Sequence, residues 1–310
     1  MSDGEPLVHL IDGHVWIFRS WFSMPSRTAP DGRETGAAYG FTSSLIKYLR
    51  EHEPSHVGMC FDHAMTSFRN AIEPGYKADR GEPEPALAAQ FALCREAAEA
   101  LGVAVYEAPD FEADDVIATL ADRLVPGGAS VRVVTVDKDL AQLVTEDGRV
   151  VLYDNAKDAT FDSRGVREKF GVDPGQIPDY LGLVGDAVDC LPGVPGVGAK
   201  SAAAVLDAFE TLDRIPPPGE PWSAVRVRGA ARLAERIQTH RDRALRTREL
   251  ATVRRDVPGV RSDLRTLAWR GAHPELVQTL FRRLGWERIT TRVPRWIGNS
   301  APDAPGKPLE

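Results

Sequence analysis

Residues 131–139 read VRVVTVDKD, a short β-branched apolar run that ends abruptly in two aspartates. Such a run predicts a buried strand. The same arrangement recurs in LVHLID at residues 7–12 and in HVGMCFD at residues 56–62. Each predicted strand is therefore followed by a carboxylate, and this repeated pattern decides both the fold and the location of the candidate site.

Helical patterns separate the predicted strands, which also include residues 103–106 and 150–153. The helices of this part are predicted at residues 37–51, 85–101, 113–124 and 138–144. Strands that alternate with helices predict βαβ units with right-handed crossovers. We therefore expect an α/β fold whose mostly parallel sheet has helices on both faces.

After about residue 165 the strand pattern fades and helices dominate. They are predicted at residues 163–170, 177–184, 200–209, 229–248 and 274–284, with a loop at the PPPG sequence of 216–219. The Gly- and Pro-rich residues 298–310 predict a disordered tail. The expected organisation is an α/β domain over residues 1–170, a helical domain over 171–297, and the tail.

Charge is unevenly distributed along the 310 residues, whose formal net charge is −7. Residues 200–310 carry 21 Lys+Arg and 13 Asp+Glu, whereas residues 1–199 carry 17 and 32. This asymmetry indicates one part that holds cations and another that holds a polyanion. The alternative is a solvated arginine-rich surface.

Composition also bears on the cellular compartment. The three cysteines lack metal-type spacing, and so small and odd a number favours a reducing compartment over a disulfide scaffold. The sequence contains neither a run long enough for a membrane span nor a recognisable signal peptide. We therefore expect a cytoplasmic protein that does not associate with membranes.

Acidic residues gather where the carboxyl ends of the strands are expected. They are Asp12, Asp62, Glu112, Asp114, Asp115, Asp137 and Asp139, with Asp186 and Asp189 further along. In a parallel sheet these ends meet at one edge, and acids two residues apart in an extended segment point the same way. So many anions require cations, and oxygen ligands favour Mg²⁺ or Mn²⁺ over Zn²⁺. Single acids such as Asp115 or Asp139 could be helix caps, but capping does not account for the whole set.

Two further stretches could contact phosphate. Gly196 and Gly198, with Lys200 at the start of a helix, predict a helix–hairpin–helix turn whose backbone N–H groups bind phosphate without reading bases. A plain turn is the alternative. The stretch SFRNAIEPGYKADR at residues 67–80 interleaves cations with an aromatic ring, as suits a nucleic-acid strand. Its candidates are Arg69, Tyr76, Lys77 and Arg80. An ordinary polar loop is the alternative there, and Arg19 is either an exposed arginine or a phosphate contact.

Six motifs occur in order: LIDGHVWIFRSWFS, YGF, FDHAMTSFRNAIEPGYKADR, FEADDVIATLA, TVDKDLAQLV and GDAVDCLPGVPGVGAKSA. Together they resemble the bacterial 5′-nuclease family of 5′–3′ exonucleases and flap endonucleases, which also forms the N-terminal part of bacterial DNA polymerase I. The resemblance covers about residues 7–290. Because no polymerase sequence follows, a free-standing member is expected.

The resemblance implies a PIN-like (resolvase-like) nuclease domain with a helical arch at about 69–90, and a helix–three-turn–helix at about 179–209. All nine acids match the family's metal ligands. It implies that Asp12, Asp62, Glu112 and Asp114 serve chiefly one ion, and that Asp137, Asp139, Asp186 and Asp189 serve chiefly a second. Lys77, Arg80 and Arg19 match its phosphate contacts. Two positions depart from the family: Cys190 replaces a usual Asn, and Pro195 stands where a basic residue is common.

The activity implied is hydrolysis of DNA at 5′ flaps, nicks and primer ends, RNA-primed ends included, that leaves a 5′-phosphate and a 3′-hydroxyl. It would use two or more Mg²⁺ or Mn²⁺ ions, with K⁺ at the helix–three-turn–helix. A monomer that acts at the nucleoid with a polymerase and a ligase is expected. The alternatives are a non-catalytic DNA-structure-binding relative and a PIN ribonuclease that acts on RNA. The complete acid set favours the nuclease.

Overall fold

The computed structural model describes residues 4–220 and 222–299, so most of the predicted tail lies outside the described residues. The chain divides into two compact units, and both are discontinuous in sequence. Unit 1 comprises the residues up to His63, Glu82–Val134 and the residues from Val257 onward. Unit 2 comprises Ala64–Gly81 and Thr135–Asp256.

Unit 1 is built on four parallel strands. They are β1 (Leu7–Asp12), β2 (His56–Cys60), β3 (Ala104–Tyr106) and β4 (Ser130–Val134), in the order β3-β2-β1-β4. In β1 and β2 every residue after the first is buried, and Leu10 is fully buried, as expected for strands covered on both faces. The predicted α/β class and parallel sheet are thereby confirmed.

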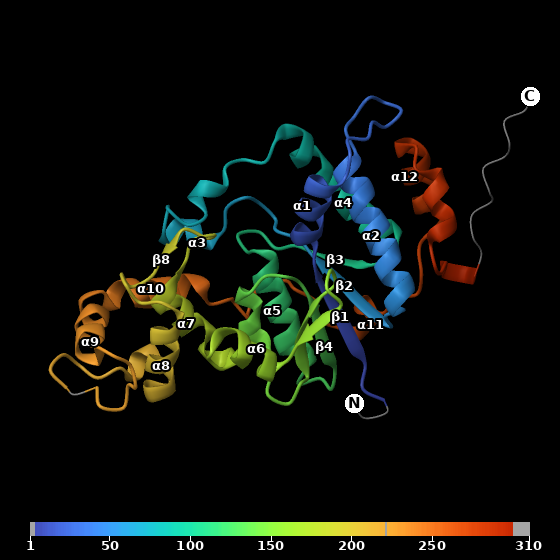
Figure 1. The fold of residues 1–310 in the computed structure, drawn as a ribbon. Helices are drawn as coiled ribbons and strands as arrows, with labels where there is room; N and C mark the ends of the chain where they lie inside the picture. Colours follow the sequence, from blue (N-terminus) through green and yellow to red (C-terminus); the bar gives the residue numbers. More distant parts are fainter. Residues whose placement is uncertain (1–3, 221, 300–310) are drawn as a thin grey trace, which may run out of the picture. The chain divides into compact units, whose positions relative to one another are not determined.

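Helices lie on both sides of these strands, as Figure 1 shows for α5 and α2. The main ones are α1 (Gly13–Ser23), α2 (Gly36–His52), α4 (Pro85–Ala100) and α5 (Ala113–Leu124). Helix α5 packs against β1, β2 and β4, while α1, α2 and α4 pack against one another. Unit 1 also contains α11 (Leu264–Leu267), α12 (Pro274–Leu284) and the 3₁₀ helices η5 (Glu287–Arg292) and η6 (Ile297–Asn299).

Unit 2 contains two short antiparallel pairs. Strand β5 (Val150–Asp154) pairs with β6 (Ala159–Phe161), and β7 (Gly185–Asp186) pairs with β8 (Leu191–Pro192). The sequence predicts β5 but not β6, β7 or β8, because two or three residues are too few to show a periodic pattern.

Helices outnumber strands in unit 2. Its helices are α3 (Phe68–Ile72), η1 (Ala78–Arg80), η2 (Asp139–Leu143), α6 (Ser163–Phe170), η3 (Pro174–Gln176), α7 (Ile177–Val184), α8 (Ala199–Phe209), η4 (Leu212–Arg214), α9 (Ala230–Thr239) and α10 (Arg241–Ala251). The single helix predicted over 229–248 is wrong: it breaks at His240, whose φ of −113° and ψ of 21° are not helical. The break gives α10 its own direction, along which it packs closely on α7. Among the described helices, none combines the length and apolar character needed to cross a membrane.

Candidate metal centre and phosphate-contact residues

Parallel pairing in unit 1 brings carboxylates to one edge of the sheet. Asp12 ends β1, is 4% exposed, and accepts a hydrogen bond from the Val15 N–H at 3.3 Å as the cap of α1. The strand register places Asp12 beside Cys60, two residues before Asp62. The Asp62 Oδ1 atom accepts the Ala113 N–H at 2.7 Å, which ties the start of α5 to the same edge.

The remaining acids of unit 1 lie in the first turn of α5. Asp115 is fully buried, and its Oδ2 atom accepts the backbone N–H of Glu112 at 3.1 Å within a reciprocal capping box. This contact favours the capping interpretation for Asp115 over a direct metal ligand. Asp114 is half-buried. Burial, and then the charges of Asp12 and Asp114, raise the pKa of the Cys60 thiol, which places both carboxylates near that residue.

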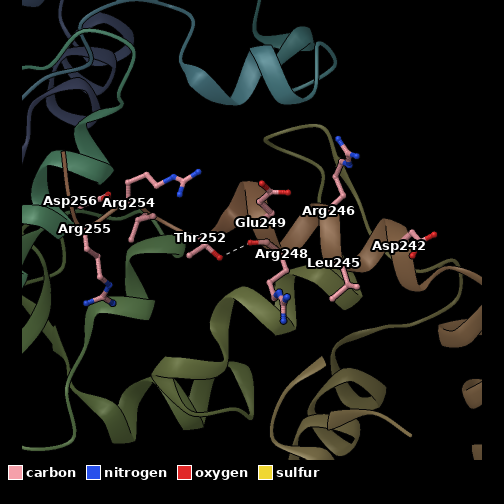
Figure 2. A pocket seen from close by; sticks show the side chains of 10 residues that line it. Asp242, Leu245, Arg246, Arg248, Glu249, Thr252, Arg254, Arg255 and Asp256 are labelled. Carbon is pink, nitrogen blue, oxygen red and sulfur yellow. Dashed lines mark hydrogen bonds between the residues drawn. The ribbon is translucent and has the colours of Figure 1, made fainter. Parts of the chain in front are cut away.

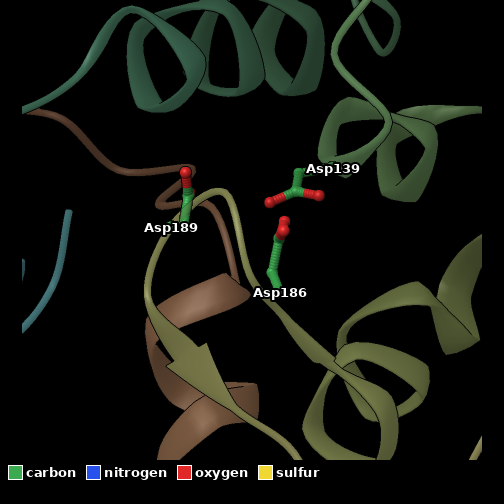
Figure 3. A group of neighbouring side chains, drawn as sticks. All are labelled: Asp139, Asp186 and Asp189. Atoms are coloured by element: carbon green, nitrogen blue, oxygen red, sulfur yellow. The ribbon is translucent and has the colours of Figure 1, made fainter. Parts of the chain in front are cut away.

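In unit 2 three buried carboxylates form a cluster. Oxygen atoms of Asp139, Asp186 and Asp189 all lie within 4.8 Å of one another, and each residue is at most 8% exposed. Figure 3 shows the carboxylate of Asp139 directed toward that of Asp186. Asp137 adjoins the cluster, and its Oδ1 atom accepts the Asp139 N–H at 2.8 Å. Four of the predicted metal ligands are thus neighbours.

The chemistry of this cluster fits a divalent cation. Within the described residues, the buried Oδ1 atom of Asp139 has no hydrogen-bond partner, although buried polar atoms normally have one. Burial, and then the charges of Asp137, Asp186 and Asp189, raise the pKa of Asp139 to about 8. A cation would supply the missing partner and relieve the repulsion, and the all-carboxylate donor set suits Mg²⁺ or Mn²⁺.

Two of the three cations predicted to act on the phosphate, Lys77 and Arg80, contact Asp189. The Arg80 guanidinium is 2.6 Å from its Oδ1 atom, and the Lys77 Nζ atom is 3.8 Å from its Oδ2 atom. The Lys77 N–H also donates to the Asp189 carbonyl at 3.0 Å, and Lys77 has a φ of 54°. Burial raises the pKa of Asp189, and the two cations only partly offset that increase.

A lysine that the sequence reasoning did not assign sits at the same cluster. The Lys138 Nζ atom donates to the Asp186 Oδ2 atom at 2.8 Å. Burial opposes the charge of Lys138, but the hydrogen bond and the charge of Asp186 outweigh it and raise its pKa. One feature of the sequence could have identified Lys138 as a site residue: it lies between Asp137 and Asp139, and a residue flanked by two site acids lies at the edge of the site.

Two predicted phosphate or base contacts are buried instead. Arg69 is 2% exposed, and its guanidinium donates to the carbonyls of Leu250 at 2.7 Å and Thr252 at 3.2 Å, at the end of α10. This arrangement favours a structural role, since cations commonly satisfy the last carbonyls of a helix. Tyr76 is 3% exposed, with its hydroxyl 3.3 Å from Asp189, so its ring is not presented for stacking. Arg19, by contrast, is exposed on α1.

The predicted glycine turn precedes α8. Gly196 has a φ of +73°, and its carbonyl accepts a bond from Arg236 at 3.3 Å. Gly198 is the N-cap residue of α8, and a Cβ atom there would meet nothing within 4 Å. Lys200 is exposed in the first turn of α8. The Val197 N–H within this turn is bonded to the Val194 carbonyl at 3.0 Å, whereas Gly198 and Lys200 are exposed at the start of α8, so the phosphate contact of these two residues stays a prediction.

Two glycines near the cluster were missed by sequence reasoning. A Cβ atom on Gly185 would lie 2.4 Å from the Gly193 nitrogen, and one on Gly193 would lie 2.3 Å from the Val184 carbonyl carbon. Only glycine allows β7 and β8 to approach so closely, and this approach holds Asp186 in place. Cys190, where the family usually has Asn, has a φ of +56°, a conformation that Asn adopts more readily.

An open pocket of about 880 Å³ is lined by residues of α10 and of the segment that follows it, and Figure 2 shows their side chains. Arg246, Arg254 and Arg255 are exposed there. Arg248, in contrast, is held by Asp179 at 3.2 Å and Asp213 at 2.5 Å. Part of the arginine-rich region is thus structural, while Arg246, Arg254 and Arg255 are exposed in this pocket together with the acids Asp242, Glu249 and Asp256.

Comparison with known proteins identifies the fold and the family. Residues 7–171 match the model of the 5′–3′ exonuclease N-terminal resolvase-like domain, and residues 172–275 match the 5′–3′ exonuclease C-terminal SAM fold. These matches confirm the predicted resolvase-like domain followed by a helical one.

Solved structures share the fold. A bacteriophage T5 5′-exonuclease with bound zinc superposes with a TM-score of 0.63 at 19% identity, covering 90% of this chain and 98% of that one. A phage T5 flap endonuclease in a pseudo-enzyme–product complex with DNA and metal ions gives 0.62 at 19%, covering 79% and 88%.

DNA polymerase I of Bacillus caldotenax is 38% identical over 289 residues, which cover 92% of this chain and 32% of that protein. The chain therefore spans about a third of the length of this relative. With both family models matched in order, the acids at the sheet edge and the buried cluster of unit 2 place this chain in the 5′–3′ exonuclease family.

Proposed function

We propose that this chain is a divalent-metal-dependent 5′-nuclease that hydrolyses DNA at 5′ flaps, nicks and primer ends, RNA-primed ends included. The observation that carries the proposal is the cluster of Asp139, Asp186 and Asp189 with its unsatisfied buried oxygen. A protein that only bound DNA would gain nothing from three buried, mutually repelling carboxylates, whereas a metal site requires them.

The carboxylates would hold the ions in two groups. Asp12, Asp62, Glu112 and Asp114 would hold one ion, and Asp137, Asp139, Asp186 and Asp189 another. Asp115 would support α5 through its contact with Glu112. A bound divalent ion supplies a water of lowered pKa and positive charge for the leaving 3′-oxygen. The products would be a 5′-phosphate and a 3′-hydroxyl.

Lys77 and Arg80 would balance the charge that develops on the phosphate. Their contacts with Asp189 already concentrate positive charge at the cluster. Arg19 would make a further phosphate contact from α1. These cations would act on the reaction, while duplex binding would rest on other residues.

The duplex would be held by the turn before α8 and by exposed arginines of α10 and of the segment that follows it. Gly196, Gly198 and Lys200 would contact phosphates, with a K⁺ ion at this turn, and the exposed Arg246 and Arg254 would add sequence-independent attraction. Such contacts position DNA without reading its bases. We further propose a monomer that acts in the nucleoid of the cytoplasm alongside a DNA polymerase and a ligase.

The decisive experiment incubates the protein with a labelled 5′-flap substrate, with Mg²⁺, with Mn²⁺ and with chelator. We expect cleavage near the flap junction that needs metal, and no cleavage by Asp139→Asn. Binding of the flap without cleavage under every metal condition would instead assign the chain to the non-catalytic DNA-binding class.

A further inference from the structure

Lys138 is a cation within bonding distance of the carboxylate cluster. Its Nζ atom lies 2.8 Å from Asp186, whose own side chain is only 4% exposed. The other oxygen of Asp186 accepts the Val188 N–H at 3.0 Å. The oxygen that Lys138 occupies therefore belongs to a buried carboxylate that a metal ion would need.

The lysine is also able to leave. Its side chain is 36% exposed, so a change of rotamer can carry the ammonium into solvent. A lysine is a compact point charge on a flexible stem, whereas an arginine in this place would bind the carboxylate in a fixed bidentate manner. Two anions, Asp137 and Asp139, flank it in sequence and contribute to its attraction to the cluster.

We propose that Lys138 is the exchangeable counter-ion of Asp186: it neutralises the cluster in the metal-free protein and is displaced when a divalent ion binds. Lys138 thereby sets how much metal the protein needs. The inference rests on the metal site of the proposed function. It assigns to Lys138 a role in metal loading, separate from that of Lys77 and Arg80, which contact Asp189.

Binding of Mn²⁺ alone, without DNA, tests this role, with free Mn²⁺ followed by electron paramagnetic resonance. Lys138→Met removes the competing charge, so we expect Mn²⁺ affinity to rise roughly tenfold, as for loss of one charged hydrogen bond. Lys138→Arg should bind no more tightly than wild type. In chelator, Lys138→Met should melt below wild type, and saturating Mn²⁺ should remove the deficit.

Lys157→Met is the matched control, because Lys157 pairs with the buried Asp154 at 3.5 Å in the same unit but outside the cluster. Its Mn²⁺ affinity should equal that of wild type. Should Lys138→Met fail to fold, the displacement of Lys138 can be tested on the wild-type protein by measuring the rate at which each lysine is acylated, with mass spectrometry as the readout. Mn²⁺ should accelerate acylation of Lys138 and leave that of Lys157 unchanged.

The outcomes separate the two proposals. If wild type binds Mn²⁺ but Lys138→Met binds it no more tightly, the counter-ion role is wrong while the metal site stands. The same conclusion follows if wild type binds Mn²⁺ but the rate of Lys138 acylation does not change when Mn²⁺ is added. If neither wild type nor any Lys138 variant binds Mn²⁺, the proposed function and this inference are both wrong.

Discussion

Replacing Asp139 with Asn should make the metal-free protein more stable as it removes the activity. The pKa of Asp139 is raised from 3.8 to about 8 in the folded protein. Between these values the folded state binds one proton more than the unfolded state, so stability falls as pH rises. One proton corresponds to about 1.4 kcal/mol per pH unit, and two units between pH 5 and 7 give a loss of about 2–3 kcal/mol. Asparagine does not titrate and should abolish this part of the slope.

Urea denaturation in chelator at pH 5, 6 and 7 measures the effect as the difference in unfolding free energy between wild type and Asp139→Asn. The difference should grow with pH in favour of the variant. Asp207→Asn, at an exposed position of α8, is the control and should follow wild type at every pH. Parallel pH profiles for wild type and Asp139→Asn would refute the assignment of raised proton affinity to the cluster.

Four further substitutions separate catalysis, duplex binding and structure. Lys77→Ala should lower the single-turnover rate more than DNA affinity, because its charge acts mainly as the transition state forms; a pure loss of affinity would make it a plain anchor. Lys200→Ala should reduce the slope of log affinity against log salt by roughly one unit or slightly less, with the cleavage rate restored at saturating DNA. Arg69→Leu should lower the unfolding free energy by about 2–4 kcal/mol, because it leaves helix-end carbonyls buried without their donors; weaker DNA binding at unchanged stability would restore the phosphate-contact interpretation. Cys190→Asn should raise the unfolding free energy by about 0.5–1 kcal/mol, because Asn tolerates the left-handed backbone better; an equal or lower melting temperature would show that the thiol makes a compensating contact.

Local signals decided which parts of the fold the sequence could predict. Helices α6, α7 and α12 begin and end at the predicted residues, because Asp162 caps α6 and prolines open the other two. The sheet followed from apolar runs. The break at His240 carries no glycine or proline, so no local signal in the sequence marked it.

The candidate site was predictable as a set of residue types but less so as a set of contacts. Asp139 was predicted from the strand end that it follows, whereas Asp186 and Asp189 were assigned to the same site through the family resemblance. The contacts of Arg69 with α10 and of Lys138 with Asp186 each join residues far apart in sequence, and the Lys138 contact also depends on the rotamer of the lysine. Tertiary packing decides both contacts. An arginine in a basic motif looks the same in sequence whether it faces solvent or a helix end.

The discontinuity of unit 1 has a consequence for synthesis on the ribosome. Its sheet consists of residues made early, but Trp269, which is 4% exposed, donates from its indole N–H to the Leu101 carbonyl at 2.9 Å and from its backbone to Ser55 at 2.8 Å. His273 likewise bonds Ala100 at 2.8 Å. Vectorial synthesis delivers all of unit 2 before the segment that begins at Val257. The core next to Ser55, Ala100 and Leu101 therefore stays uncovered until that segment leaves the ribosome. Nascent chains should consequently depend on protection from aggregation until the residues around Trp269 and His273 have been made.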